Sequence, residues 1–300
     1  MVRYFAHFII RTFGVCGGIL GMKARSTRSL FFAVCACLAL LGDFKTHAQN
    51  LLAYEGFNYT TGLSTNSNGG VGWNGSWYQN SDLTGNPTAV VYQAGSMNFP
   101  TGVGFSATGN RIGSTTSWPN NVGFRQLAPS ATINLGADAT YYFSFLYDSM
   151  DTGAWGGLSF WDSSGNEQLF FGVYNQKYFL AGLLGSGGQA GSAASYTQNY
   201  LTGKIVARAS GSDEVYLQPY SPFEAVPSTE PTSWLLSRTD ISSSSLLDRV
   251  RIASGASGGY EIDEIRLGTT YQAAIVPEPS AFSLLAVGFV GLAVLRYRRP

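Results

Sequence analysis

Short apolar or alternating runs recur along residues 49–275, and clusters of Gly, Asn, Ser and Asp separate them. Neither a strong amphipathic helix pattern nor an internal repeat interrupts this arrangement. Runs of this length between turn-forming residues are typical of β-strands. Roughly a dozen of them over about 225 residues fit two packed sheets. The pattern therefore predicts an all-β domain, a two-sheet jelly-roll sandwich.

The strongest expected strand is 141–147, whose odd positions place four aromatic rings on one face. Runs at 167–174 and 177–181 flank Asn175 and Gln176, which predict a two-residue hairpin turn. Further strands are expected at 213–218, 248–252 and 260–268, with loops at 185–195 and 242–245.

Cysteine and histidine occur only near the N-terminus. If residues 1–48 are removed, the rest of the chain contains neither residue type. Disulfides, Cys/His zinc sites, cysteine nucleophiles and triads with a histidine base are then excluded. The residues concerned are Cys16, Cys35, Cys37, His7 and His47.

Residues 22–48 have the order of an export signal. Three basic residues precede an uncharged apolar run of twelve residues at 30–41, which suits a signal peptide and is too short to span a bilayer. Small residues follow at Thr46 and Ala48, so we expect cleavage between Ala48 and Gln49 after export by the Sec translocon. The basic residues are Lys23, Arg25 and Arg28.

Residues 1–21 form a second apolar stretch before this signal. We take residues 1–48 as the signal peptide region, with Met22 as the expected true start. The alternative is an N-terminal membrane anchor that stays on the protein. The polar residues between 43 and 46 break the apolar run and favour cleavage.

The C-terminal residues 276–300 have three parts in order. A proline-containing segment comes first, and its prolines favour extended backbone. An uncharged apolar run at 281–295 follows, which as a helix would reach only about 22 Å of the roughly 30 Å hydrocarbon core. The chain then ends on a basic segment, 296–300. The first part contains Val276, Pro277, Glu278, Pro279 and Ser280, and the last contains Arg296, Arg298 and Arg299.

This tail resembles the PEP-CTERM sorting signal of Gram-negative bacteria, with all three elements in order. The resemblance implies that an exosortase recognises and cleaves the chain near Pro277–Pro279. The apolar run would then be a short transmembrane helix that holds the protein in the inner membrane until processing. The basic end stays cytoplasmic by the positive-inside rule, so residues 49–275 are expected outside and later reach the cell surface or an exopolysaccharide matrix. The alternative is an ordinary C-terminal membrane anchor.

A second resemblance lies in the middle of the chain. The segments 52–57 and 72–77, together with the closing run 262–268, look like laminin-G-like, concanavalin-A-like domains of exported bacterial proteins. Such domains often bind glycans, sometimes with calcium. We therefore expect residues 49–275 to form one concanavalin-A-like sandwich.

Tryptophan and aspartate supply the candidate binding residues. Exposed indole rings stack on sugar rings, although most tryptophans in a sandwich fill its core. Aspartates around an expected hairpin offer hard oxygen ligands for calcium, and the alternative is that they cap their own turns. The sugar-binding candidates are Trp73, Trp77, Trp118, Trp155 and Trp161, and the calcium candidates are Asp148, Asp151 and Asp162.

The run 261–265 is similar to the Glu-x-Asp-x-Glu strand of jelly-roll glycoside hydrolases, in which alternation places the acidic side chains on one face. Here Glu261 and Asp263 keep the pattern, but Ile265 stands at the fifth position. Glu264 points to the opposite face in a regular strand. No catalytic residue is therefore assigned, and the strand is expected to be structural.

Charged residues make up 12% of the chain, against roughly 25% in ordinary soluble domains. Residues 49–276 contain 9 basic and 16 acidic residues, a net charge of −7. This charge disfavours nucleic acid as a partner. The sequence thus predicts a non-enzymatic surface or matrix protein with carbohydrate binding as a candidate activity and no required cofactor. The alternatives are a glycan-active enzyme with a degenerate motif and a purely structural matrix protein.

Overall fold

The computed structural model describes residues 50–100, 107, 109–114, 120–149, 155–175, 177–182, 189–193, 199–255 and 259–275. The signal peptide, the sorting tail, Trp118 and Asp151 lie outside these ranges. Within them, no helix has the length and apolar character needed to cross a membrane.

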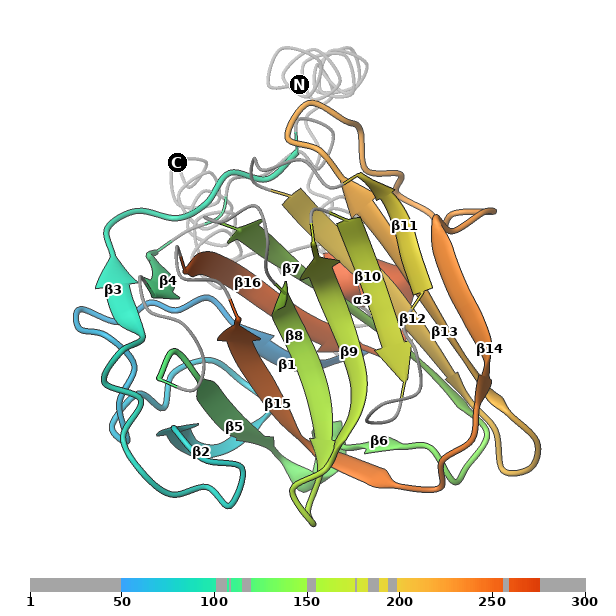
Figure 1. Ribbon diagram of the computed structural model, residues 1–300, viewed down its shortest axis with the longest axis horizontal. Coiled ribbons are helices and arrows are strands. Elements are labelled where there is room, and N and C mark those ends of the chain that lie inside the picture. The colour runs from blue at the N-terminus through green and yellow to red at the C-terminus, as the bar shows by residue number, and fades with distance from the viewer. Residues whose placement is uncertain are drawn as a thin grey trace, which may run out of the picture. The chain divides into compact units, whose positions relative to one another are not determined.

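The described chain folds into two antiparallel sheets that lie one behind the other (Figure 1). Sheet A has the order β14-β13-β12-β7-β16-β4-β3, and β1 pairs with β16 beside this path. Its strands are β1 (Leu51–Glu55), β3 (Val91–Gln93), β4 (Arg111–Ser114), β7 (Ala139–Ser149), β12 (Asn199–Ala207), β13 (Asp213–Tyr220), β14 (Leu236–Ile241) and β16 (Tyr260–Gly268).

Sheet B has the order β11-β10-β9-β8-β15-β5-β2, and β6 pairs with β15 beside this path. The all-β sandwich predicted from the sequence is confirmed. The strands of this sheet are β2 (Trp73–Tyr78), β5 (Gly123–Leu127), β6 (Ile133–Asn134), β8 (Trp155–Asp162), β9 (Glu167–Tyr174), β10 (Lys177–Gly182), β11 (Gln189–Ala193) and β15 (Leu246–Ser254).

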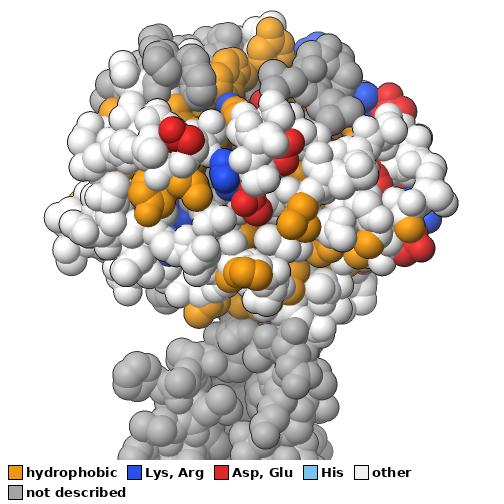
Figure 2. Space-filling model, turned by 90° about the horizontal axis from the view of Figure 1, so that it is seen from below, with side chains coloured by type: hydrophobic (Ala, Val, Ile, Leu, Met, Phe, Trp, Pro, Cys, Tyr) orange, Lys and Arg blue, Asp and Glu red, His pale blue; other side chains and the backbone are white. Residues whose placement is uncertain are grey.

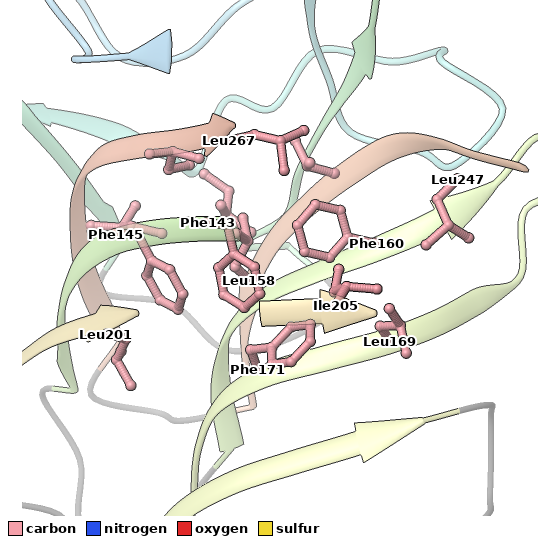
Figure 3. Packing of buried hydrophobic residues seen from close by; sticks show 14 of the residues in the cluster. Phe143, Phe145, Leu158, Phe160, Leu169, Phe171, Leu201, Ile205, Leu247 and Leu267 are labelled. Atoms are coloured by element: carbon pink, nitrogen blue, oxygen red, sulfur yellow. The ribbon is translucent and has the colours of Figure 1, made fainter. Parts of the chain in front are cut away.

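The core between the sheets is rich in aromatic rings (Figure 3). All four odd-numbered aromatics of β7 belong to it, as the sequence predicts. Phe143 lies at the centre, with its ring centroid 4.4 Å from that of Phe171 and 5.5 Å from that of Phe160. Gly203 on β12 leaves room for this ring, because a Cβ there would lie 2.0 Å from Phe143 Cζ. Burial of such rings is the main stabilising contribution to a sandwich of this kind.

The predicted hairpin at Asn175 is confirmed. Tyr174 of β9 pairs with Lys177 of β10, so two residues connect the strands. Asn175 has a φ of 47°, the left-handed conformation that the tight two-residue turns require and that Asn tolerates.

The expectation of a loop throughout 185–195 is wrong at 189–193, where the chain forms β11 (Gln189–Ala193), and the other residues of that range lie outside the described ones. The small and polar residues at 189–193 do not show the apolar alternation by which a strand is predicted from sequence. The strand forms because backbone groups of β10 at the sheet edge pair with it, as Leu180 does with Gln189 and Phe179 with Ala190.

The outer face of sheet A has its own apolar cluster, which the short helix α3 (Tyr271–Ile275) joins. Even-numbered residues of β7, Tyr142 and Leu146, contribute to it, so β7 is buried on both faces. The sequence pattern did not predict this helix, since its five residues are too few to show a helical period.

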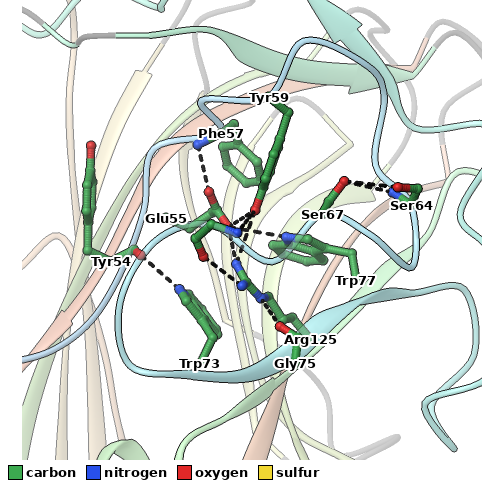
Figure 4. Close-up of polar contacts among 11 residues, drawn as sticks. Tyr54, Glu55, Phe57, Tyr59, Ser64, Ser67, Trp73, Gly75, Trp77 and Arg125 are labelled. Atoms are coloured by element: carbon green, nitrogen blue, oxygen red, sulfur yellow. Dashed lines mark hydrogen bonds and ion pairs between the residues drawn. The ribbon is translucent and has the colours of Figure 1, made fainter.

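A buried ion pair links the two sheets where the chain enters the sandwich (Figure 4). Glu55 on β1 belongs to sheet A, and Arg125 on β5 belongs to sheet B; both side chains are 1% exposed. Glu55 also accepts hydrogen bonds from the Phe57 amide (2.8 Å), the Tyr59 hydroxyl (2.8 Å) and the Trp77 indole (3.3 Å). The carboxylate is therefore held by four donors.

Arg125 uses its remaining donors on the backbone of the segment after β1. Its guanidinium donates to the carbonyl oxygens of Gly69 at 2.7 Å and Gly75 at 3.1 Å. The rings of Trp73 and Trp77 lie 4.9 and 5.7 Å from its Cζ. Burial lowers the pKa of Arg125, and the neighbouring Glu55 opposes this shift. Such a pair stabilises the fold only while both partners and their hydrogen bonds are present.

We predict that Arg125→Met lowers the free energy of unfolding by about 3–5 kcal/mol, because it leaves the Glu55 carboxylate buried without its cation. The double variant Glu55→Leu/Arg125→Met should lose less than the sum of the two single changes. Arg208→Met is the matched control, because its ion pair with Glu214 is solvent-exposed and should contribute little to the free energy of unfolding. Urea denaturation measures the free energy of unfolding of the wild type, both single variants, the double variant and the control. A loss in the double variant equal to the sum of the two single losses would contradict the prediction.

Candidate functional site

Side chains that alternate away from the core form a row of aromatic rings on the outer face of sheet B. On β8 and β9 the core takes Leu158, Phe160, Leu169 and Phe171, so the residues between them point outward. We call these rings the aromatic row. It consists of Phe124, Trp161, Trp155, Phe170, Phe179 and Tyr174, from strands β5, β8, β9 and β10.

The rings of the aromatic row contact one another across the strands. Trp161 meets Phe124 edge-on with centroids 5.0 Å apart. Phe170 lies 6.1 Å from Trp155 and 6.0 Å from Phe179, and Phe179 lies 5.2 Å from Tyr174. Contacts of this kind add to the burial energy of each ring and hold its orientation.

A glycine pair allows Trp155 and Phe170 to meet. Gly157 of β8 stands opposite Gly172 of β9, between these two residues on the outer face. A Cβ at Gly172 would lie 2.1 Å from the Gly156 carbonyl oxygen, and one at Gly157 would lie 2.3 Å from that of Phe171. The close approach of the two backbones therefore requires glycine at both positions, and no side chain stands between the rings there.

Arg251 of β15 lies between the two tryptophans of the row. Its Cζ is 5.3 Å from the Trp155 ring centroid and 4.9 Å from that of Trp161. Glu167 forms an ion pair with its guanidinium. Burial lowers the pKa of Arg251, and Glu167 opposes the shift. The stack fixes both indole rings, and the carboxylate of Glu167 adds a hydrogen-bond acceptor beside them.

One end of the aromatic row is open to solvent. Tyr174 is 47% exposed, and Trp155 and Phe179 are half-buried. Trp161 and Phe170 are buried, and Leu83 packs beside Trp161. The accessible rings are therefore those toward β10.

The structure gives the sequence candidates different environments. Trp155 and Trp161 belong to the aromatic row, whereas Trp73 and Trp77 pack around Arg125, and Trp77 has no exposed surface. Sequence reasoning missed Phe170, Phe179 and Tyr174. Strand alternation could have found them, because each is next to a core residue of β9 or β10.

Of the calcium candidates, the structure describes Asp162, which caps its own turn, and Asp148, which lies beside Glu261. Asp162 accepts hydrogen bonds from the amides of Ser164 (2.9 Å) and Asn166 (3.0 Å) and from the Gln168 side chain (2.8 Å). Asp148 stands opposite Glu261, and burial together with Glu261 raises its pKa to about 6. Among the residues that the structure describes, no three acidic, Cys or His side chains gather as a metal site would require.

The acidic residues of β16 lie on the outer face of sheet A. The expectation that Glu264 would point away from Asp263 is wrong, because β16 has a bulge between Asp263 and Arg266 and Glu264 has a φ of 53°. The extra residue moves Ile265 into the core and leaves both carboxylates outside.

Each of these carboxylates has a partner. Glu261 pairs with Arg111 at 2.7 Å, and Glu264 pairs with Arg266 at 3.1 Å and accepts the Tyr54 hydroxyl at 3.1 Å. Asp263 is fully buried and accepts the Met97 and Glu264 amides at 3.0 and 2.8 Å. Burial, with Glu264 adding, raises the pKa of Asp263 to about 8. This arrangement suits a structural role at the bulge.

Few charged side chains occur on the face shown in Figure 2, and its hydrophobic side chains occur in several separate groups. A surface of this kind favours ligands that are recognised by apolar contact and hydrogen bonds over ligands recognised by charge.

The C-terminal residues 276–299 match the model of the PEP-CTERM protein-sorting motif. The sorting tail inferred from the sequence is thereby confirmed. No curated protein matches the sequence of this chain.

Several solved structures are similar to this chain at low sequence identity. The binding domain of Paraclostridial Mosquitocidal Protein 1 is 9% identical with a TM-score of 0.45, over 76% of this chain and 51% of that one. The globular domain of T. cruzi calreticulin is 11% identical with a TM-score of 0.38, over 83% and 100%. The endo-β-1,4-glucuronan lyase of Trichoderma reesei is 9% identical with a TM-score of 0.35, over 60% and 89%. This chain thus spans about half of the mosquitocidal domain, and both binding domains and enzymes occur among these structures.

We predict that the folded domain loses stability as the pH rises toward 8. Asp263 has a folded pKa of about 8, above the unfolded value of about 3.9, so the folded state holds its proton more tightly. The contribution of Asp263 to the free energy of unfolding is complete below pH ~4 and is lost as the pH rises to ~8. Between pH 6.5 and 7.5, above the titration of Asp148, the loss should approach about 1.4 kcal/mol per pH unit, and it should fall to about half of that near pH 8, where Asp263 is half deprotonated.

Urea denaturation at several pH values measures this slope. Asp263→Asn should flatten it, whereas Asp82→Asn, on an exposed loop, should leave it unchanged. An equal slope in the Asp263→Asn protein would show that another group is responsible.

Proposed function

We propose that this chain is an exported, non-enzymatic surface or matrix protein that an exosortase processes at its C-terminal tail, and that its sandwich binds an exopolysaccharide. The sorting motif at 276–299 supports the first part. The observation that supports the second part is the stack of Trp155, Arg251 and Trp161, which holds two indole rings on the outer face of sheet B.

The chemistry of the aromatic row suits a sugar chain. The C–H faces of a pyranose ring pack on flat aromatic rings, and its hydroxyl groups need hydrogen-bond partners at the edge of the platform. Trp155, Phe179 and Tyr174 supply partly exposed rings, and Glu167 supplies the polar edge. The net charge of −7 disfavours polyanions, so the proposed ligand is a neutral polysaccharide.

The processing of the tail follows from its three parts. The prolines at 277 and 279 keep the motif extended and separate it from the apolar run 281–295. The run holds the chain in the inner membrane, and the basic residues 296–299 stop complete passage. Cleavage at the motif would release the sandwich from the membrane of a Gram-negative cell toward its surface or matrix.

The alternative of a glycan-active enzyme depends on Glu261 and Asp263. A glycosidase needs two carboxyl groups that both reach the scissile bond. Asp263 is fully buried, Glu261 pairs with Arg111, and Ile265 lies in the core. These contacts favour binding over hydrolysis as the proposed activity.

We predict that Tyr174→Ala weakens binding of the processed protein to neutral polysaccharides about three- to tenfold, which corresponds to the loss of one stacking ring. Trp155→Ala should weaken it at least tenfold, because the stack with Arg251 is lost as well. A glycan array followed by titration calorimetry measures the effect. Phe223→Ala is the matched control, since this ring is 88% exposed and lies in the loop after β13. Equal binding by the control and the Tyr174→Ala protein would contradict the proposal.

We also predict that replacing Pro277, Glu278 and Pro279 with alanine leaves the full-length protein in the inner membrane. The processing enzyme then loses the motif, while the apolar run still anchors the chain. Deleting residues 277–300 should instead give soluble periplasmic protein. Membrane fractionation and mass spectrometry of the C-terminus follow both variants. Triple-alanine protein that reaches the surface at the normal mature mass would place the processing signal elsewhere.

A further inference from the structure

The helix α3 is packed against the outer face of sheet A up to its last residue. Ala274 and Ile275 are 0% and 3% exposed. Ile275 belongs to the outer apolar cluster together with Leu146 and Tyr200. The end of the helix is therefore part of the folded domain.

Specific contacts hold α3 in this place. The Ser144 hydroxyl on β7 donates a hydrogen bond to the Ala274 carbonyl oxygen at 2.5 Å. The Tyr271 ring meets Tyr142 and Trp234 edge-on, with centroids 6.1 and 6.5 Å apart. Both ends of the helix are thus fixed to the sheet or to the loop beside it.

The sorting motif follows this helix without a linker. Its match begins at residue 276, and Pro277 is the second residue after Ile275. Two residues reach at most ~7 Å even when fully extended. An enzyme that cleaves a peptide bond takes hold of extended backbone on both sides of it, and proteolysis concentrates where the backbone is free to adopt that form. Residues 274 and 275 cannot adopt it while they are helical and buried.

We propose that α3 has to leave sheet A before an exosortase can process the sorting motif, so that the docking of α3 controls the rate of release. This inference rests on the proposed function of the tail. The partner is the exosortase itself, and α3 is the segment that it receives along with the motif. After cleavage α3 returns to sheet A, because its apolar side chains are then better buried than exposed.

The movement of α3 leaves the core between the sheets in place. The outer cluster that holds α3 is separate from the core between the sheets. The pairing of β1 with β16, which closes the sandwich, ends at Gly268 before the helix begins. A helix of five residues has no stability of its own once it leaves the sheet.

A disulfide between α3 and β16 tests the proposal. A Cβ built on Gly268 lies 2.9 Å from the Cβ of Ala273, close to the separation that a disulfide needs. It also lies 2.9 Å from the Asn50 carbonyl oxygen, so the backbone must shift there, and the Gly268→Cys single variant controls for that shift. Residues 49–300 contain no other cysteine that could compete. The variant Gly268→Cys/Ala273→Cys should form the bond during export and be processed at least tenfold more slowly than either single-cysteine variant in a pulse-chase experiment. Reductant should restore the rate.

Two further variants separate the possible causes. Five Gly and Ser residues inserted between Ile275 and Val276 should restore processing of the locked protein, since the motif can then be reached without moving α3. Ser144→Ala, which removes a hydrogen bond to the helix, should speed processing of the unlocked protein.

These experiments distinguish a failure of the inference about α3 from a failure of the proposed function of the tail. Processing of the triple-alanine variant would mean that the motif is not the signal. A block in that variant together with normal processing of the oxidised, locked protein would overturn only the role of α3. A locked protein that stays unprocessed even with the inserted residues would also overturn it, because the lock would then act through something other than access to the motif.

Discussion

The ion pair between Glu55 and Arg125 joins the first strand of sheet A to an inner position of sheet B. Two charges removed from water are tolerable only when further donors and acceptors surround them. Tyr59 and the Gly69 carbonyl, from the irregular chain between β1 and β2, supply two of these partners, and Trp77 and the Gly75 carbonyl of β2 supply the others. The pair therefore holds both this irregular chain and β2 to β1 and β5.

The two outer faces of the sandwich differ in what covers them. Sheet A carries an apolar cluster closed by α3 and by residues such as Met97, Phe99 and Trp234 from neighbouring loops. Sheet B carries the aromatic row, whose end at Tyr174 is exposed. Because one face is already packed, the face of sheet B is the better position for a ligand. The bulge in β16 follows the same division, since it keeps Glu264 out of the core together with Asp263, which accepts the Met97 amide.

The position of the sorting motif connects the fold to the release of the protein. Asn50 and Thr269 are joined by hydrogen bonds, so the chain enters and leaves the sandwich at the same place. The sorting motif then begins directly after a buried helix. If an exosortase processes this motif as proposed, the docking of α3 and the release of the domain compete for the same residues.

Strand alternation in the sequence was sufficient to predict the sandwich, the hairpin at Asn175 and the four aromatic rings of β7 that fill the core, since these depend on neighbours along the chain. The three-part order of the tail was sufficient for the sorting motif, because such a signal is read from the linear chain. Local pattern could not assign the tryptophans, because Trp77 and Trp155 both lie in strands beside an arginine. Only the tertiary packing separates them, since Trp77 lies in the core against Phe57 and Trp155 lies on the outer face of sheet B. Nor could it place Glu264, whose face depends on a bulge. Tertiary structure decided these points because burial and register are set by contacts between strands far apart in the sequence, which no local pattern contains.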